Sequence, residues 1–245
     1  MIKETENQMK ENLYKNYYST HWYTAQKVDY NKAIIYLKYN YDNIFNKLDR
    51  NIKILEIGSW QWKFAYYLKE KWLKNYIWLD LDPDIIKETQ GKFKDYKFYN
   101  ISALEYLKDK KYEFDIIYMS HVFEHFTLEE WIKLARLIYQ ALKKWGLWIN
   151  EMPNAQSIYY ATYWRYNDIT HKIIYTTNSF NQILLRAWFK RENIIHKNEY
   201  IGTTLIKRFI FKIWYILHKI WMLSLWVSLK EPHTFNLITI IKKDD

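Results

Sequence analysis

Short apolar runs alternate with amphipathic stretches through the middle of the chain. The apolar runs are typical of buried strands and lie at residues 52–58, 76–80, 97–100 and 114–119, with a further strand beginning at 147–150. The amphipathic stretches have helical spacing and lie at residues 64–71, 83–89 and 128–143. Strands and helices that alternate at this interval predict an α/β fold, with a parallel sheet covered by helices on both faces.

The two ends of the chain differ from this pattern. Residues 1–48 predict an N-terminal helical extension, residues 49–200 the alternating core with an insertion, and residues 201–245 an amphipathic helix followed by a last strand. A chain of 245 residues fits one domain with such additions. Because its first twelve residues are polar and contain no apolar run like that of a secretory signal, we expect a cytoplasmic protein.

The cysteine count and the net charge narrow the chemistry. The chain has no cysteine, which excludes disulfides, thiolate nucleophiles and zinc sites built on cysteine. The formal net charge of +10 would attract phosphate, but the lysines are spread along the whole chain without a dense basic block. The sequence therefore does not favour nucleic acid as a partner, although a nucleic-acid substrate stays an alternative.

The first strand-to-helix turn carries the clearest chemical pattern, Glu56-Ile57-Gly58-Ser59-Trp60-Gln61-Trp62. A nucleotide cofactor that approaches such a turn requires residues without side chains, so that the backbone can lie against it. Gly58 meets that need, whereas Trp60 and Trp62 stand where the same argument asks for glycine. Asp80 ends the second strand 22 residues after Gly58, where a carboxylate can accept hydrogen bonds from ribose hydroxyls.

With glycine at positions 60 and 62, this turn resembles the first motif of the class I S-adenosylmethionine (SAM)-dependent methyltransferases. Residues 114–126 and 143–147 also resemble later segments of that family. The resemblance implies a Rossmann-like, three-layer α/β/α fold with a mostly parallel seven-stranded sheet, and SAM as cofactor. The cofactor-binding residues that it implies are Glu56, Gly58, Trp60, Trp62, Asp80, Leu81 and Ser102. Ser102 departs from the family, which has an acidic residue near the adenine at that place.

A second set of segments resembles a subgroup of this family that is often associated with polysaccharide and glycan clusters. The most distinctive is Arg165-Tyr166-Asn167-Asp168-Ile169-Thr170-His171, which is similar to the subgroup's R-Y-x-D-x-T-H. Residues 19–22 and 178–189 are similar to other segments of the subgroup, and residues 151–154 to a segment of the family, so the likeness covers about residues 15–242. It implies a small-molecule or glycan-type acceptor that is contacted by Arg165, Asp168 and His171. The other interpretation is an Arg–Asp pair that holds a loop.

Residues 121–125, His-Val-Phe-Glu-His, allow three interpretations. As a loop at the carboxyl edge of the sheet they would line the reaction site, where His121 or His125 would remove the acceptor proton, because imidazole titrates near neutral pH. The same letters spell an inverted zinc-protease motif, which needs a helix to aim both histidines at one metal. The third interpretation is a structural turn capped by Glu124 and His125. Their position directly after a buried strand favours the first interpretation, with no resident metal.

The frequencies of glycine and tryptophan are unusual. The chain has 4 glycines and 13 tryptophans, and together these make up about 7% of its residues, the usual share of glycine alone. Tryptophan occupies positions at which the family, or a turn, favours glycine: Trp22, Trp60, Trp62, Trp72, Trp78, Trp145, Trp164 and Trp188. Because so many bulky residues would disrupt a packed fold, our hypothesis is that the organism decodes UGA as glycine. The alternative is a degenerate, tryptophan-rich relative with poor cofactor binding.

Residues 205–229 form the most apolar stretch of the chain. Arg208, Lys212, Tyr215 and Lys219 recur at helical spacing and predict a basic face. The longest uncharged run, 220–229, is too short to span a bilayer. An interfacial helix that attaches the protein peripherally to the inner face of a membrane stays open, as does packing against the domain or against a second copy in a homodimer.

The predicted function is therefore SAM-dependent methyl transfer, with O-methylation of a small or glycan-type acceptor. A degenerate, nonenzymatic Rossmann-like protein is the first alternative, favoured if the tryptophans are genuine. A nucleic-acid methyltransferase is the second. A nicotinamide dehydrogenase fits less well, because Glu56 before the turn and the later segments follow the methyltransferase order.

Overall fold

The computed structural model describes residues 29–58, 62–200, 202, 204–224 and 231–244. The helices are α3 (Tyr30–Phe45), α4 (Lys63–Glu70), α5 (Pro83–Lys92), α6 (Ala103–Tyr106), α7 (Leu128–Ala141), α8 (Ile158–Asn167), α9 (Thr177–Arg186) and α10 (Leu205–Ser224). The strands are β1 (Ile54–Ile57), β2 (Tyr76–Asp80), β3 (Lys97–Asn100), β4 (Phe114–Ser120), β5 (Leu142–Pro153), β6 (Ile194–Asn198) and β7 (Asn236–Lys242). Two short 3₁₀ turns are η2 (Phe123–His125) and η3 (Arg191–Asn193).

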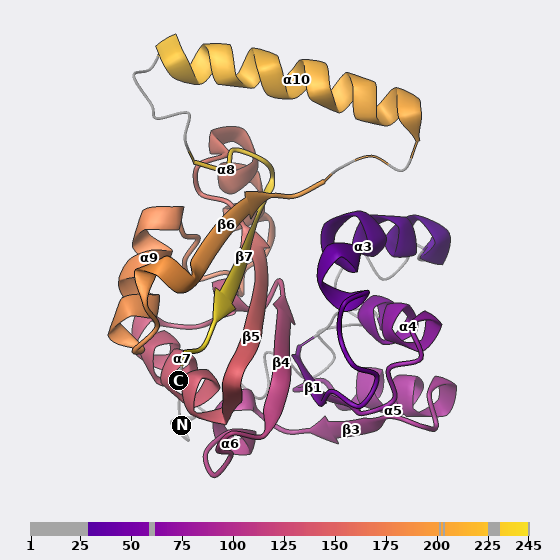
Figure 1. Ribbon diagram of the computed structural model, residues 1–245. Coiled ribbons are helices and arrows are strands. Elements are labelled where there is room, and N and C mark those ends of the chain that lie inside the picture. The colour runs from indigo at the N-terminus through magenta and orange to yellow at the C-terminus, as the bar shows by residue number, and fades with distance from the viewer. Residues whose placement is uncertain (1–28, 59–61, 201, 203, 225–230, 245) are drawn as a thin grey trace, which may run out of the picture.

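The strands form one seven-stranded sheet in the order β3-β2-β1-β4-β5-β7-β6 (Figure 1). Neighbouring strands are parallel in the pairs β3–β2, β2–β1, β1–β4 and β4–β5. Strand β7 runs antiparallel to both β5 and β6. This confirms the predicted Rossmann-like, mostly parallel sheet. The predicted helix 128–143 is two residues shorter, because Leu142 already pairs with Phe114 as the first residue of β5.

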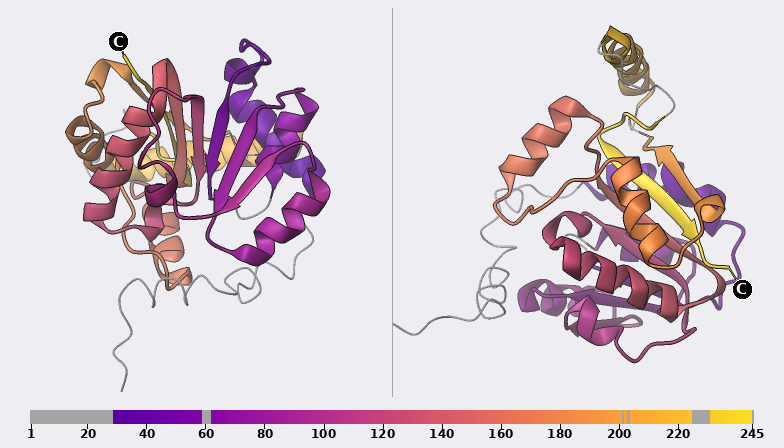
Figure 2. Two further views of the ribbon diagram at one scale, coloured as in Figure 1. Left: turned by 90° about the horizontal axis from the view of Figure 1, so that it is seen from below. Right: turned by 90° about the vertical axis from the view of Figure 1, so that its left-hand side faces the viewer.

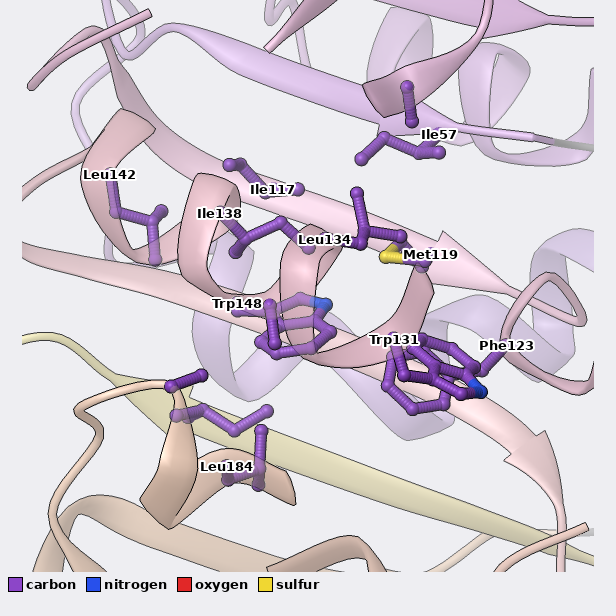
Figure 3. Packing of buried hydrophobic residues seen from close by; sticks show 14 of the residues in the cluster. Ile57, Ile117, Met119, Phe123, Trp131, Leu134, Ile138, Leu142, Trp148 and Leu184 are labelled. Carbon is purple, nitrogen blue, oxygen red and sulfur yellow. The ribbon is translucent and has the colours of Figure 1, made fainter. Parts of the chain in front are cut away.

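Helices cover both faces of the sheet, so the core is divided into two layers (Figure 2). Successive side chains of a strand point to opposite faces: Ile54 packs in the layer with α3, α4 and α5, whereas Leu55 packs in the layer with α6, α7 and α9. Figure 3 shows the second layer, in which Leu134 and Ile138 of α7 lie against Ile117 and Met119 of β4. The continuous apolar runs of the sequence follow from this double burial.

The last helix stands apart from the sheet, beyond the end at which β4 and β5 finish (Figure 1). It docks through one side: Trp214 lies 4.8 Å from Phe235 between ring centroids, and the Tyr215 hydroxyl donates to Asn198 Oδ1 at 3.3 Å. Arg208 lies over the Tyr39 ring at 4.0 Å. Part of the predicted basic face is therefore turned toward the protein. Within the described residues, no helix is both long and apolar enough to cross a bilayer.

Candidate active site

The chain reverses its direction of travel across the sheet between β1 and β4, and the carboxyl ends of these two strands meet there. Ligands of open α/β sheets bind at this point. Gly58 directly follows β1 and has a φ of +59°, and a Cβ at this residue would lie 2.6 Å from Cγ2 of Val122, just after β4. Glycine is favoured here, because the left-handed conformation is costly for a residue with a Cβ and the close approach leaves no room for one. The two turns are thus packed directly against each other.

The other residues of the glycine-type turn are placed in part. Trp60 lies outside the described residues. Trp62 immediately precedes α4, and its indole stacks on Tyr30 with centroids 4.3 Å apart while Lys92 Nζ lies 3.6 Å from its centroid. A large side chain therefore fills space at the start of α4, where the predicted cofactor groove begins.

The predicted cofactor residues on β1, β2 and β3 lie at or near the same edge. Glu56 is buried within β1 and accepts a hydrogen bond from the Tyr76 hydroxyl. Asp80 ends β2, where its Oδ1 accepts from the backbone N–H of Asp82 at 2.9 Å, and Leu81 beside it is 37% exposed. Ser102 caps α6 by accepting from the Glu105 N–H at 3.2 Å. Its oxygen thus accepts a hydrogen bond at the helix start, and its O–H remains a possible donor.

The exit of β4 forms a histidine–glutamate pair. His121 follows the strand with a φ of +53°, and its Nδ1 lies 3.2 Å from Oε1 of Glu124. Glu124 is 1% exposed, whereas the His121 side chain is 36% exposed. The segment after His121 is a single 3₁₀ turn, not the helix that an inverted zinc-protease motif requires, so that interpretation fails on geometry.

The loop after α8, residues 168–172, folds back onto this turn. The carbonyl of Glu124 accepts from the N–H of Lys172 at 2.7 Å, which holds residues 168–172 against η2. Thr170 Oγ1 donates to Asp168 Oδ1 at 2.6 Å and lies 2.7 Å from Nδ1 of His125. Because its hydroxyl proton is directed at Asp168, Thr170 accepts from His125, which places that ring's proton on Nδ1 and its lone pair on Nε2.

The acid–base properties of the two histidines differ. Burial alone lowers the pKa of His121, but the hydrogen bond and charge of Glu124 outweigh it, and the net pKa is raised. Burial, with the neighbouring His171, lowers the pKa of His125 to about 4 despite the charge of Glu124. Burial raises the pKa of Glu124, yet His121 reverses this effect and the net pKa is lowered. Glu124 is thus a buried carboxylate, and His125 is a neutral imidazole at pH 7.

A second acidic group, not identified from the sequence, lies next to His121. Glu151 near the end of β5 has Oε1 3.9 Å from His121 Nε2, and it accepts from the hydroxyls of Tyr41 at 2.5 Å and Tyr36 at 2.7 Å. The same Tyr36 hydroxyl lies 3.1 Å from Oε2 of Glu199. The position of Glu151 at the carboxyl edge was a usable signal. Tyr36 and Glu199 had none, because they come from remote parts of the chain.

The Glu199 carboxyl makes the stability of the protein depend on pH. Burial, then the charge of Glu151, raise its pKa from 4.5 to about 7. The folded state therefore holds the Glu199 proton more tightly than the unfolded chain does. The free energy of unfolding is highest, as far as Glu199 determines it, below about pH 4.5, and it falls by about 3 kcal/mol as the pH rises to about 7. We expect Glu199→Gln to have the higher melting temperature at pH 8 and no such advantage at pH 4.5, whereas Glu129→Gln on the surface behaves like wild type at both. The same difference in melting temperature between wild type and Glu199→Gln at both pH values would contradict this.

The predicted acceptor residues separate into two groups. Asp168 and His171 are buried and lie in the cluster around His125, with the two histidine ring centroids 4.8 Å apart. Arg165 is in the last turn of α8 with its guanidinium 5.5 Å from the centroid of the Tyr166 ring. The structure thus brings Asp168 and His171 to the β4 exit and leaves Arg165 on a neighbouring helix.

Comparison with known proteins agrees with this fold. Residues 32–193 match the family described as a methyltransferase domain, which covers about two thirds of the chain. The protein therefore belongs to this methyltransferase family and is an enzyme. Comparison with curated proteins gave no match.

Solved methyltransferases share the fold. A SAM-dependent methyltransferase from Archaeoglobus fulgidus is 24% identical with a TM-score of 0.65, over 87% of this chain and 94% of that one. A putative methyltransferase in complex with the Trm112 activator from Haloferax volcanii is 12% identical with a TM-score of 0.59, over 88% and 90%. A putative O-methyltransferase from Nostoc punctiforme is 16% identical with a TM-score of 0.54, over 82% and 55%.

Proposed function

We propose that the protein transfers a methyl group from SAM to a hydroxyl of a small or glycan-type acceptor. The observation that carries the proposal is the His121–Glu124 pair at the carboxyl edge of β4, next to the turn at Gly58. Transfer to a hydroxyl needs a base held at this edge, because the hydroxyl loses its proton, whereas a thioether or a tertiary amine has no proton to lose.

The residues around the turn fit the cofactor in two places. The backbone at Gly58 has no side chain and no room for one, and the Asp80 carboxylate at the end of β2 is only partly buried, which suits it to the ribose hydroxyls. Glu56, Leu81 and Ser102 are proposed to line the remainder. Bound SAM supplies an electrophilic methyl group on a sulfonium.

His121 is the base of the proposed reaction. Its side chain is partly exposed, and its Nδ1 is held by Glu124 while Nε2 lies on the other side of the ring. A carboxylate in this position fixes the ring orientation and stabilises the imidazolium that forms when the acceptor proton is taken. His125 is less suitable, because a pKa of about 4 makes it a weak base. Asp168 and His171 position His125, and Arg165 is left to contact the acceptor.

Transfer of a labelled methyl group tests this function. The full-length protein is incubated with methyl-labelled SAM and, separately, with oligosaccharides, small phenols and sugars, and RNA. We expect label in a hydroxyl of one of the first two groups, as a methyl ether that resists mild base. Label in RNA alone would replace the glycan assignment by the nucleic-acid alternative.

We further propose that codons of this chain that are read here as tryptophan are UGA codons, which its own organism decodes as glycine. Five non-glycine residues of the described chain have positive φ, and three of them are Trp72, Trp145 and Trp188, at 60°, 64° and 73°. This conformation is costly for any residue with a Cβ and routine for glycine. Trp72 and Trp188 each follow a helix, where glycine in this conformation is the usual terminator.

Buried tryptophans support the same proposal. The indole N–H groups of Trp78, Trp131 and Trp148 are buried and have no hydrogen-bond acceptor among the described residues, although a buried indole usually finds one. Trp131 and Phe123 have ring centroids 2.5 Å apart, well inside the about 4.5–7 Å of packed aromatic pairs (Figure 3). Glycine at these positions removes both the unpaired donors and the overlap.

The exposed face of α10 is proposed to lie on an anionic membrane surface. Its outward residues are large and apolar: Leu205, Ile206, Phe209, Ile210, Ile213, Ile216, Leu217, Ile220, Trp221 and Leu223. Lys207 and Lys212 are exposed among them, and the helix contains no acidic residue. A helix with this combination of apolar area and positive charge suits an interface of anionic lipid.

Vesicle binding checks the membrane proposal. We expect the protein to sediment with anionic vesicles at low salt, and Lys207→Gln with Lys212→Gln and Lys219→Gln to weaken binding by about 100-fold, since each charge contributes about 1 kcal/mol. The matched control is a variant with three lysine-to-glutamine changes spread over the core domain, Lys74→Gln, Lys87→Gln and Lys108→Gln. Protein that stays in the supernatant and forms dimers in solution would assign the face to a second copy instead.

A further inference from the structure

Three side chains from two separate segments meet beside the proposed base. Glu124 and His125 come from the turn after β4, and His171 comes from the loop after α8. Each offers one ligand atom, and these atoms all lie within 4.8 Å of one another. Two imidazoles and one carboxylate form a known ligand set for catalytic zinc, which keeps a further position open for water or substrate.

The buried carboxylate is the observation that points to a cation. Glu124 is 1% exposed, and its Oε2 has no hydrogen-bond partner among the described residues. Its Oε1 lies 3.2 Å from His121 and 3.9 Å from Nε2 of His171. A buried carboxylate oxygen without a partner is costly, and a bound cation removes that cost.

The neighbours of the two histidines prepare them as ligands. Because the Asp168–Thr170 pair fixes the proton of His125 on Nδ1, Nε2 is the ring nitrogen that carries the lone pair a metal would bind, as is usual for metal-bound histidine with a second polar partner. Nε2 of His171 lies 3.9 Å from Oδ2 of Asp168 as well as from Glu124. Ligands about 2.0–2.2 Å from one ion lie at most about 4.4 Å apart, so binding draws the widest pair slightly together.

We infer that Glu124, His125 and His171 bind one divalent transition-metal ion, with zinc as the best match. Imidazole ligands favour zinc, iron or nickel over magnesium, which prefers oxygen ligands. If the proposed methyl transfer holds, an ion here lies beside His121 and can polarise an acceptor hydroxyl whose proton His121 takes. This site differs from the inverted zinc-protease motif, because His171 takes the place of His121 as ligand.

Zinc titration of the full-length, untagged, chelator-stripped protein tests the site without cofactor or acceptor. We expect one Zn²⁺ per chain with a Kd of about 1 µM or tighter, a higher melting temperature on binding, and no competition from Mg²⁺. Glu124→Gln and His171→Gln should each weaken binding by at least about 100-fold, whereas His218→Asn on α10 should not change it. Circular dichroism checks that each variant is folded.

The role of Thr170 separates a metal site from a merely structural cluster. Thr170→Val removes the acceptor for His125 Nδ1 and should weaken zinc binding by about 10- to 100-fold, and Thr170→Ser should restore it. No saturable zinc binding, or equal binding by wild type, Glu124→Gln and His171→Gln, overturns the inference. Since the titration contains neither SAM nor acceptor, either of these results leaves the proposed methylation intact, and an inactive enzyme that binds zinc leaves the metal site intact.

Discussion

Replacement of His121 by asparagine is expected to lower kcat for methyl transfer by about 10²- to 10⁴-fold, the usual contribution of a positioned general base. Asparagine suits the test because residue 121 has a φ of +53°, a conformation that asparagine tolerates better than most residues. The variant therefore keeps the turn and loses the proton acceptor. The measurement is the rate of label transfer to the acceptor found in the acceptor screen, at saturating SAM.

The binding of S-adenosylhomocysteine gives the control for His121→Asn. Its Kd should stay within about threefold of wild type, because His121 is proposed to act on the acceptor and not to hold the cofactor. His218→Asn, on α10, should leave both kcat and Kd unchanged. A His121→Asn enzyme with wild-type kcat would remove His121 as the base and return that role to His125.

Glycine at positions 60 and 62 is expected to tighten S-adenosylhomocysteine binding by about 10- to 100-fold over protein made with tryptophan there. A cofactor turn that requires bare backbone loses about 1–3 kcal/mol of binding free energy to overpacking when it carries two tryptophans, which converts to this change in Kd. Calorimetry on the two forms of the full-length protein measures it. Trp72→Gly is the matched control: it relieves a φ of 60° after α4 and should raise the melting temperature without changing the Kd.

Mass spectrometry of protein from its own organism decides the decoding directly. Peptides covering residues 60 and 62 should carry glycine masses. Tryptophan masses in those peptides, together with weak S-adenosylhomocysteine binding that glycine does not improve, would instead support a degenerate relative with the fold but without the cofactor.

The sequence by itself determined the sheet and its first turn. The continuous apolar runs at β1, β2 and β4 could be recognised because these strands are buried on both faces. Gly58 could be recognised because a turn with this conformation, packed closely against Val122, favours a residue without a side chain. The same local logic marked Trp72, Trp145 and Trp188 as glycine positions, where the backbone has positive φ. The apolar runs and the glycine positions depend on the backbone of short segments, so the sequence of those segments was enough to identify them.

Only the tertiary structure decided which side chains meet at the β4 exit. His125 contacts Thr170, which is 45 residues later, and Glu151 joins Tyr36, 115 residues earlier, because strand order and loop return bring these segments together. The sequence identified His121, His125, Asp168 and His171 singly, but neither the division of roles between the histidines nor the Glu124–His125–His171 group. Spacing along the chain carries no information about such contacts. They depend on how the loop after α8 packs against η2, which comes much earlier in the chain.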